Sequence, residues 1–145
     1  MNLAKPEAKV TTPITATIKA LQVLSVKKIS IFTPYTKTIN DSIISYFDKK
    51  NIIINSLTYF DIASDLDIGK VDEEHLFEVL SKINLSDSDA LFISCTALPA
   101  LSIIDKLEKK LDKIVLSSNQ TLIWDTLNEI NYKEKIDGFG KLFNS

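Results

Sequence analysis

Apolar and polar positions alternate along this chain with two different spacings. Nearly continuous apolar runs predict buried strands over residues 28–32, 52–60, 90–94 and 113–116. Apolar residues at helical spacing predict helices over residues 15–25, 39–50, 72–83, 101–111 and 117–131. Because strands and helices alternate with short connections, we expect a three-layer α/β fold in which helices cover both faces of a parallel sheet of about four strands.

The 145 residues are predicted to form a single α/β domain. Its core is expected between about residues 12 and 131, and residues 132–145, which include Gly138 and Gly140, are predicted as a tail that leaves the core. No segment reaches the length that spans a membrane, the amino terminus lacks the apolar stretch of a signal peptide, and the single cysteine is typical of a reducing compartment. We therefore expect a cytoplasmic protein.

The composition excludes several functions that are common on α/β sheets. The only glycines, at positions 69, 138 and 140, form neither a dinucleotide-binding turn nor a phosphate loop, so no nucleotide cofactor is expected. All 17 basic residues are lysines and the net charge is −2, which provides no arginine fork for phosphate and no attraction to nucleic acid or an anionic membrane. Residues 65–69 are similar to a calcium loop but lack a third ligand, and His75 is expected on the surface, so no metal site is predicted.

Cys95 stands where the third predicted strand ends and a loop leads through Pro99 into a helix. The carboxyl ends of parallel strands are where α/β proteins bind ligands, and helix amides at that edge favour a thiolate. A free cysteine is also often a small buried apolar side chain without any chemical role. From its position alone, Cys95 fits both interpretations.

Four short motifs follow the four predicted strands in order: Thr-Pro-Tyr at 33–35, Asp-Ile-Gly-Lys-Val at 67–71, Cys-Thr-Ala-Leu-Pro at 95–99 and Ser-Ser-Asn-Gln at 117–120. Together they resemble the carboxyl-terminal half of the maleate isomerase and arylmalonate decarboxylase branch of the aspartate/glutamate racemase superfamily, from about residue 10 to 143. The resemblance implies a flavodoxin-like, Rossmann-like half-domain. It also implies a cofactor-independent isomerase, racemase or decarboxylase that acts on a small (di)carboxylic acid by cysteine acid/base chemistry.

The resemblance also implies roles for individual residues. Cys95 matches the second of two cysteines that face each other across the substrate, the one that donates a proton in maleate isomerases. The backbone amides of Thr96 and Ala97 and the hydroxyl of Tyr35 match groups that hold a substrate carboxylate. Amides and a hydroxyl suit a chain without arginine, because they direct fixed dipoles at an oxyanion.

The residues by themselves also permit structural roles at these positions. Tyrosine often packs over a sheet edge, which would account for Tyr35. Asn119 and Gln120 provide amide and cap hydrogen bonds at a helix start whether or not a substrate exists. Asp65 matches a substrate-binding position that is asparagine in maleate isomerases. A carboxylate there repels a dicarboxylate at a cost on the order of 1 to several kcal/mol. Three explanations stay open: the substrate is not maleate, the Asp65 side chain points away from the pocket, or it accepts a hydrogen bond from an amino or hydroxyl group of another substrate.

The amino-terminal half that the family carries, with the first cysteine, has no counterpart in these 145 residues. A pocket between two half-domains needs both walls, so we expect little or no turnover from this chain alone. Three explanations stay open: the second wall comes from a separate amino-terminal half chain, it comes from a second copy in a homo-oligomer, or the chain is a fragment or a degenerate gene product. The alternative is a non-catalytic binding or interaction domain derived from the same family.

Overall fold

Four parallel strands form the centre of the structure, a computed structural model that describes residues 7–132 and 134–145. They are β1 (Lys28–Thr33), β2 (Ile53–Tyr59), β3 (Ala90–Ile93) and β4 (Ile114–Ser117). Each boundary lies within one residue of the predicted one. The strands lie in the order β2-β1-β3-β4, and all three neighbouring pairs are parallel. The order reverses between β1 and β3, so the crevice that binds ligands in such sheets is expected at their carboxyl ends.

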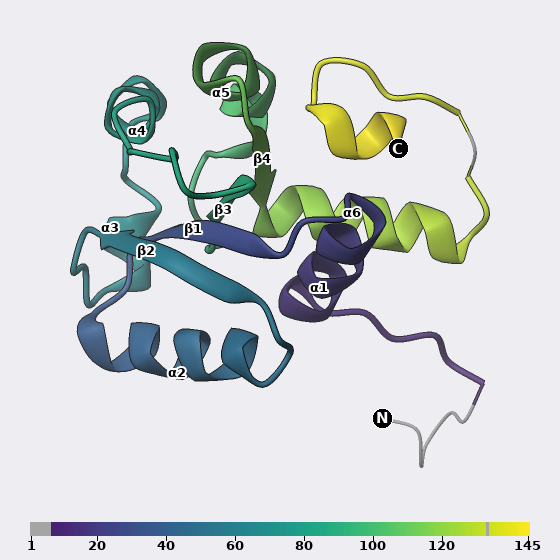
Figure 1. Cartoon of the computed structure of the whole chain (residues 1–145), viewed down its shortest axis with the longest axis horizontal. Coiled ribbons are helices and arrows are strands. Elements are labelled where there is room, and N and C mark those ends of the chain that lie inside the picture. Colours follow the sequence, from purple (N-terminus) through teal and green to yellow (C-terminus); the bar gives the residue numbers. More distant parts are fainter. Residues whose placement is uncertain (1–6, 133) are drawn as a thin grey trace.

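Helices cover both faces of this sheet, with α4 and α5 on one side and α1, α2 and α6 on the other (Figure 1). The helices are α1 (Pro13–Val23), α2 (Lys37–Asp48), α3 (Asp65–Ile68), α4 (Glu73–Leu80), α5 (Ile104–Leu111) and α6 (Ser118–Glu129). Neighbouring strand residues alternate between the two cores, since Phe32 packs on the side of α4 and α5 and Ile31 on the side of α1, α2 and α6. The predicted three-layer α/β fold with four parallel strands is confirmed.

Side-chain caps set the starts of several helices. Ser117 accepts a hydrogen bond from the backbone amide of Gln120, whose side chain reaches back to Ser117, and this capping box starts α6 where it was predicted. Asp72 caps α4 in the same way by accepting from the amide of His75, which is exposed as expected. Helix α1 begins earlier than predicted because Thr12 caps it ahead of Pro13.

The helix predicted over residues 101–111 differs at its beginning. A single 3-10 turn, η1 (Leu101–Ile103), precedes α5, so the loop that follows Cys95 is longer than expected and Pro99 lies within it. The amide of Ala100 donates to the carbonyl of Leu98 at 2.8 Å, and this tight turn delays the helix. The short helix α3 was not predicted, because four residues are too few to show helical periodicity.

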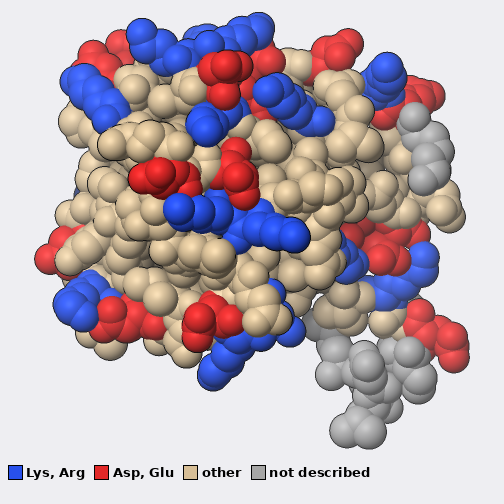
Figure 2. All heavy atoms as spheres, viewed as in Figure 1, with Lys and Arg blue, Asp and Glu red and all other residues tan. Residues whose placement is uncertain are grey.

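The surface of the described residues shows mixed charge. Lysine and acidic side chains are interspersed on the face seen in Figure 2. No helix within residues 7–132 and 134–145 combines the length and apolar character needed to cross a bilayer.

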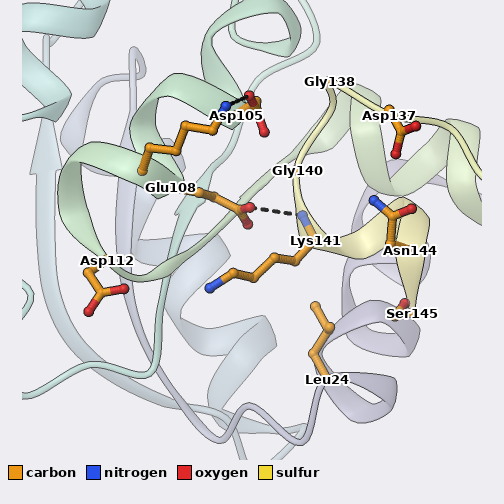
Figure 3. Close-up of a pocket in the computed structure, with 11 residues that line it drawn as sticks. Leu24, Asp105, Glu108, Asp112, Asp137, Gly138, Gly140, Lys141, Asn144 and Ser145 are labelled. Atoms are coloured by element: carbon orange, nitrogen blue, oxygen red, sulfur yellow. Dashed lines mark hydrogen bonds and ion pairs between the residues drawn. The ribbon is translucent and has the colours of Figure 1, made fainter.

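The prediction that residues 132–145 leave the core is wrong for the end of the chain. Leu142, in the 3-10 turn η2 (Lys141–Asn144), is fully buried and packs with Leu116 and Trp124. The buried carboxylate of Glu108 on α5 accepts hydrogen bonds from the backbone amides of Val115 at 3.0 Å and Lys141 at 2.8 Å (Figure 3). The sequence pattern misses this anchor because it depends on a single buried leucine and on a backbone amide bound by an acidic residue of a distant helix.

Glu108 provides a test of this anchor through its pKa. Burial raises the pKa of Glu108 above its ordinary value of 4.5, although the two amides oppose the shift. The folded protein therefore holds this proton more tightly than the unfolded chain, so the stability that Glu108 contributes is complete below about pH 4.5 and is lost as the pH rises through the raised pKa. Between pH 4.5 and pH 7 the unchanged protein is expected to lose this contribution to its free energy of unfolding, whereas a Glu108→Gln variant, which does not titrate at this position, keeps its own. The stability of the variant relative to the unchanged protein therefore rises from pH 4.5 to pH 7. Urea denaturation at both pH values measures this, and an equal stability difference at the two would contradict it.

Candidate active site

The strand order brings the Tyr35 and Cys95 loops together. Strands β1 and β3 are neighbours with Phe32 paired to Ile93, and the amide of Ser94 extends the ladder by donating to the carbonyl of Phe32 at 2.8 Å. Tyr35 and Cys95 follow these strands at the same edge, where the strand order reverses. The two residues come from loops sixty positions apart in the sequence, and only the pairing of β1 with β3 makes them neighbours.

Cys95 is almost completely buried, with 5% of its surface exposed. The backbone amide of Ala97 donates a hydrogen bond to its sulfur over 3.3 Å. An N–H group that points at a sulfur stabilises negative charge on it. The sequence predicted that helix amides would do this. Because the helix starts only after the loop, the donor is a loop amide, and Thr96 and Ala97 are both exposed there.

Tyr35 is half-buried and interacts with Cys95. Burial, followed by the hydrogen-bonding interaction with the Cys95 side chain and the negative charge of Asp65, raises the pKa of the Tyr35 hydroxyl. The hydroxyl therefore stays protonated at neutral pH and is available as a donor to an anion. The structural interpretation of Tyr35, packing over the sheet edge, also holds, because its ring contacts the apolar core on the side of α4 and α5.

A fully buried asparagine on α2 holds the Tyr35 loop. The Asn40 side chain donates to the carbonyl of Tyr35 at 3.1 Å and accepts from the hydroxyl of Thr33 at 2.6 Å. The same Thr33 hydroxyl accepts from the amide of Tyr35 at 3.3 Å. Sequence reasoning missed Asn40, although a polar residue at helical spacing with the inward-facing Ile44 and Phe47 was a usable signal.

Asp65 begins α3, which follows β2, and its side chain is exposed. It lies close enough to Tyr35 for its charge to contribute to the raised pKa of that hydroxyl. The structure thus places Tyr35, Asp65 and Cys95 in one neighbourhood at the carboxyl edge of the sheet.

The two amide side chains at the start of α6 have different partners. Gln120 is fully buried and donates to the carbonyl of Phe139 at 2.6 Å, so it serves the cap and the end of the chain. Asn119 instead donates to the carbonyl of Thr96 at 2.9 Å, which links α6 to the Cys95 loop. Sequence reasoning treated both as cap residues because nothing in the pattern separates them.

A metal cluster and a surface hollow are the alternatives to this edge among the described residues. No group of three or more His, Cys, Asp or Glu side chains among residues 7–132 and 134–145 is arranged to hold a metal ion. An open hollow of about 920 Å³ lies between α5 and the carboxyl-terminal segment, with Glu108 and Lys141 in its wall (Figure 3). None of the predicted site residues lines it. The candidate site therefore remains the edge that carries Tyr35 and Cys95.

Comparison with known proteins gives a consistent set of relatives. The sequence profile of the arylmalonate decarboxylase family matches residues 4–143. Maleate isomerase from Geobacillus stearothermophilus is 28% identical over 130 residues, which is 89% of this chain and 52% of that protein. Arylmalonate decarboxylase from Bordetella bronchiseptica is 25% identical over 137 residues, which is 92% of this chain and 57% of that protein. The chain spans about half the length of the curated relatives it matches.

Solved structures share the fold over a little more than half of their length. A cysteine-to-serine variant of Nocardia farcinica maleate cis-trans isomerase, with a covalently bound succinylcysteine intermediate, superposes with a TM-score of 0.89 at 20% identity over 94% of this chain and 56% of that one. A crystal structure of arylmalonate decarboxylase superposes with a TM-score of 0.81 at 24% identity over 91% of this chain and 59% of that one.

Proposed function

The chain belongs to the arylmalonate decarboxylase family, and from this premise we propose that it forms one wall of the active site of a cofactor-independent isomerase, racemase or decarboxylase for a small (di)carboxylic acid. One observation carries the proposal. At the point where the strand order reverses, a buried cysteine accepts a hydrogen bond from a backbone amide and interacts with a protonated tyrosine. A thiol that can hold or release a proton beside a hydroxyl donor suits proton transfer at a carbon next to a carboxylate.

Each residue has a distinct role in this proposal. Cys95 transfers a proton to or from the reacting carbon, and the amide of Ala97 stabilises the charge on its sulfur when the proton has left. The amide of Thr96 and the hydroxyl of Tyr35 hold a substrate carboxylate. The succinylcysteine intermediate of the Nocardia farcinica relative supports cysteine chemistry on a four-carbon dicarboxylate in this fold.

Asp65 narrows the substrate class. Its negative charge acts on Tyr35, so it also acts on an anion that Tyr35 holds. A second carboxylate placed near Asp65 loses on the order of 1 to several kcal/mol by repulsion. We therefore propose a substrate that presents one carboxylate to Tyr35 and an amino or hydroxyl group, rather than a second carboxylate, to Asp65.

In this proposal the second wall of the pocket lies outside these 145 residues, because the chain spans about half the length of its relatives. Leu66, next to Asp65, is 81% exposed, and Tyr59 at the end of β2 is 40% exposed, so two large apolar side chains are exposed on the β2 side of the candidate site. A separate amino-terminal half chain or a second copy of this chain would cover it. Sedimentation at micromolar concentration distinguishes the two, because a monomer excludes the second copy.

The function is tested in D₂O by NMR, which follows proton exchange at the 2-carbon of mandelate and phenylglycine, the type of substrate that Asp65 favours. Maleate and phenylmalonate are followed beside them as dicarboxylates that Asp65 disfavours. We expect little or no turnover by the chain alone, and turnover when the separately expressed amino-terminal half of the Geobacillus stearothermophilus maleate isomerase is added. In parallel, the same carboxylates are expected to slow alkylation of Cys95 by iodoacetamide in the isolated chain, whereas the uncharged diamide of maleate is not. This second measurement does not depend on assembly with the added half.

Two results would contradict the proposal in different ways. Full turnover by the isolated chain would show that one wall suffices and that the half-site interpretation is wrong. The absence of turnover in every mixture, together with no protection of Cys95 by any carboxylate, would remove the enzymatic role. The chain would then be a non-catalytic binding or interaction domain of this family.

A further inference from the structure

One peptide unit in the Cys95 loop is hydrogen-bonded at both of its polar ends. The carbonyl of Thr96 accepts from the side-chain amide of Asn119 at 2.9 Å. The N–H group of the same peptide unit belongs to Ala97, and it donates to the sulfur of Cys95 at 3.3 Å. Asn119 and Cys95 therefore contact opposite ends of a single rigid group.

The geometry of a peptide unit couples these two contacts. The unit is planar and trans, so its C=O and N–H bonds point in opposite directions and rotate together. A donor that holds the carbonyl on one side thereby directs the N–H group to the other side, where the sulfur lies. Hydrogen bonds in such a chain also polarise one another, which strengthens the donor that faces the sulfur.

The position of Asn119 on α6 shows that its side chain is not needed to start that helix. Ser117 caps α6 and Gln120 completes the capping box, and both are buried. Helix α6 packs against α1 through Thr121, whose hydroxyl lies 3.0 Å from that of Thr17. The helix start is thus held independently of Asn119, which uses its side chain to reach the neighbouring loop.

We propose that Asn119 is a positioning residue that orients the Thr96–Ala97 peptide so that its N–H group stabilises the thiolate of Cys95. The proposal deepens the proposed function, on which it rests for the role of Cys95. It assigns to the first turn of α6, directly after β4, a part in the chemistry of the thiol after β3. Without Asn119 the peptide is free to rotate, and the thiolate loses its donor.

The test measures the rate at which iodoacetamide alkylates Cys95 between pH 6 and pH 10.5, in Asn119→Ala and in the unchanged chain. Cys95 is the single cysteine, so mass spectrometry reports its reaction without interference. We expect the profile of the variant to shift to more alkaline pH, with a rate about three- to tenfold lower at pH 7 and nearly equal rates at pH 10.5, where both thiols are ionised. A variant that changed only the access of iodoacetamide to the sulfur would show the same fold-change in rate at every pH.

Two further variants complete the design. Asn128→Ala removes the same side chain from an exposed position of the same helix and is expected to leave the profile unchanged. Asn119→Ser, which is well tolerated at a helix start and too short to reach Thr96, is expected to behave like the alanine variant and carries the test if that variant unfolds. A profile that superposes on that of the unchanged chain, or that differs by one factor at all pH values, would overturn the proposal. Because alkylation needs no turnover, this result is independent of the NMR assay. A shifted profile without turnover would support the positioning role of Asn119 and contradict only the enzymatic role of the chain.

Discussion

A Cys95→Ala variant is expected to turn over substrate about 10² to 10⁴ times more slowly than the unchanged chain when each is combined with the amino-terminal half. In the proposed function Cys95 moves the proton at the reacting carbon, and Tyr35 does not replace it, since burial raises the pKa of its hydroxyl further above the ordinary value of 10.0. The fold should survive, because alanine differs from a buried cysteine only by the sulfur and costs about 1 kcal/mol. The NMR assay measures the rate, and urea denaturation measures the stability.

A serine in the same connection to α5 provides the control for this substitution. The hydroxyl of Ser102 contacts the carboxylate of Glu73 at 2.6 Å on the surface, away from the sulfur. Ser102→Ala is expected to keep most of the turnover, which separates loss of the thiol from disturbance of the connection. Turnover by Cys95→Ala within about threefold of the unchanged chain would show that another group transfers the proton.

Gly140→Ala is expected to destabilise the protein by about 2 to 5 kcal/mol, a large effect for a single methyl group. Gly140 has φ 84° and ψ 179°, a combination that is essentially restricted to glycine. A Cβ atom there would also lie 2.6 Å from Cγ2 of Ile104, which is fully buried on α5. The backbone strain and the steric overlap add, because the contact with Ile104 prevents the backbone from moving to the φ and ψ values that alanine prefers.

Gly138 is the matched control, two residues earlier in the same segment. It also has a positive φ, 87°, but a Cβ atom there would meet nothing within 4 Å. Gly138→Ala is therefore expected to cost only about 1 kcal/mol, from the backbone alone. Urea denaturation of both variants measures the difference. Equal losses at the two positions would mean that the contact with Ile104 relaxes without cost and that the end of the chain is held loosely.

The elements that depend on local patterns were predictable. Strands β1 to β4 follow from short apolar runs, and the starts of α4 and α6 follow from Asp72 and Ser117, whose side chains cap the helix that comes directly after them. The four motifs after the strands identified the family before the fold was known. The buried end of the chain was not predictable in this way, because Glu108 binds the backbone amide of Lys141, next to Leu142, and no local pattern indicates the burial of an acidic residue.

The amino-acid sequence by itself determined the order of strands and helices, the faces that they bury, and the presence of a lone thiol where β3 ends, because each depends on spacings within a few residues. Only the tertiary structure decided which loops meet. Tyr35 lies near Cys95 because β1 lies beside β3, and α6 places the side chain of Asn119 against the carbonyl of Thr96, in the peptide unit whose N–H group donates to the sulfur. Strand order and the approach of a helix to a distant loop result from the packing of the whole core, which no local spacing encodes.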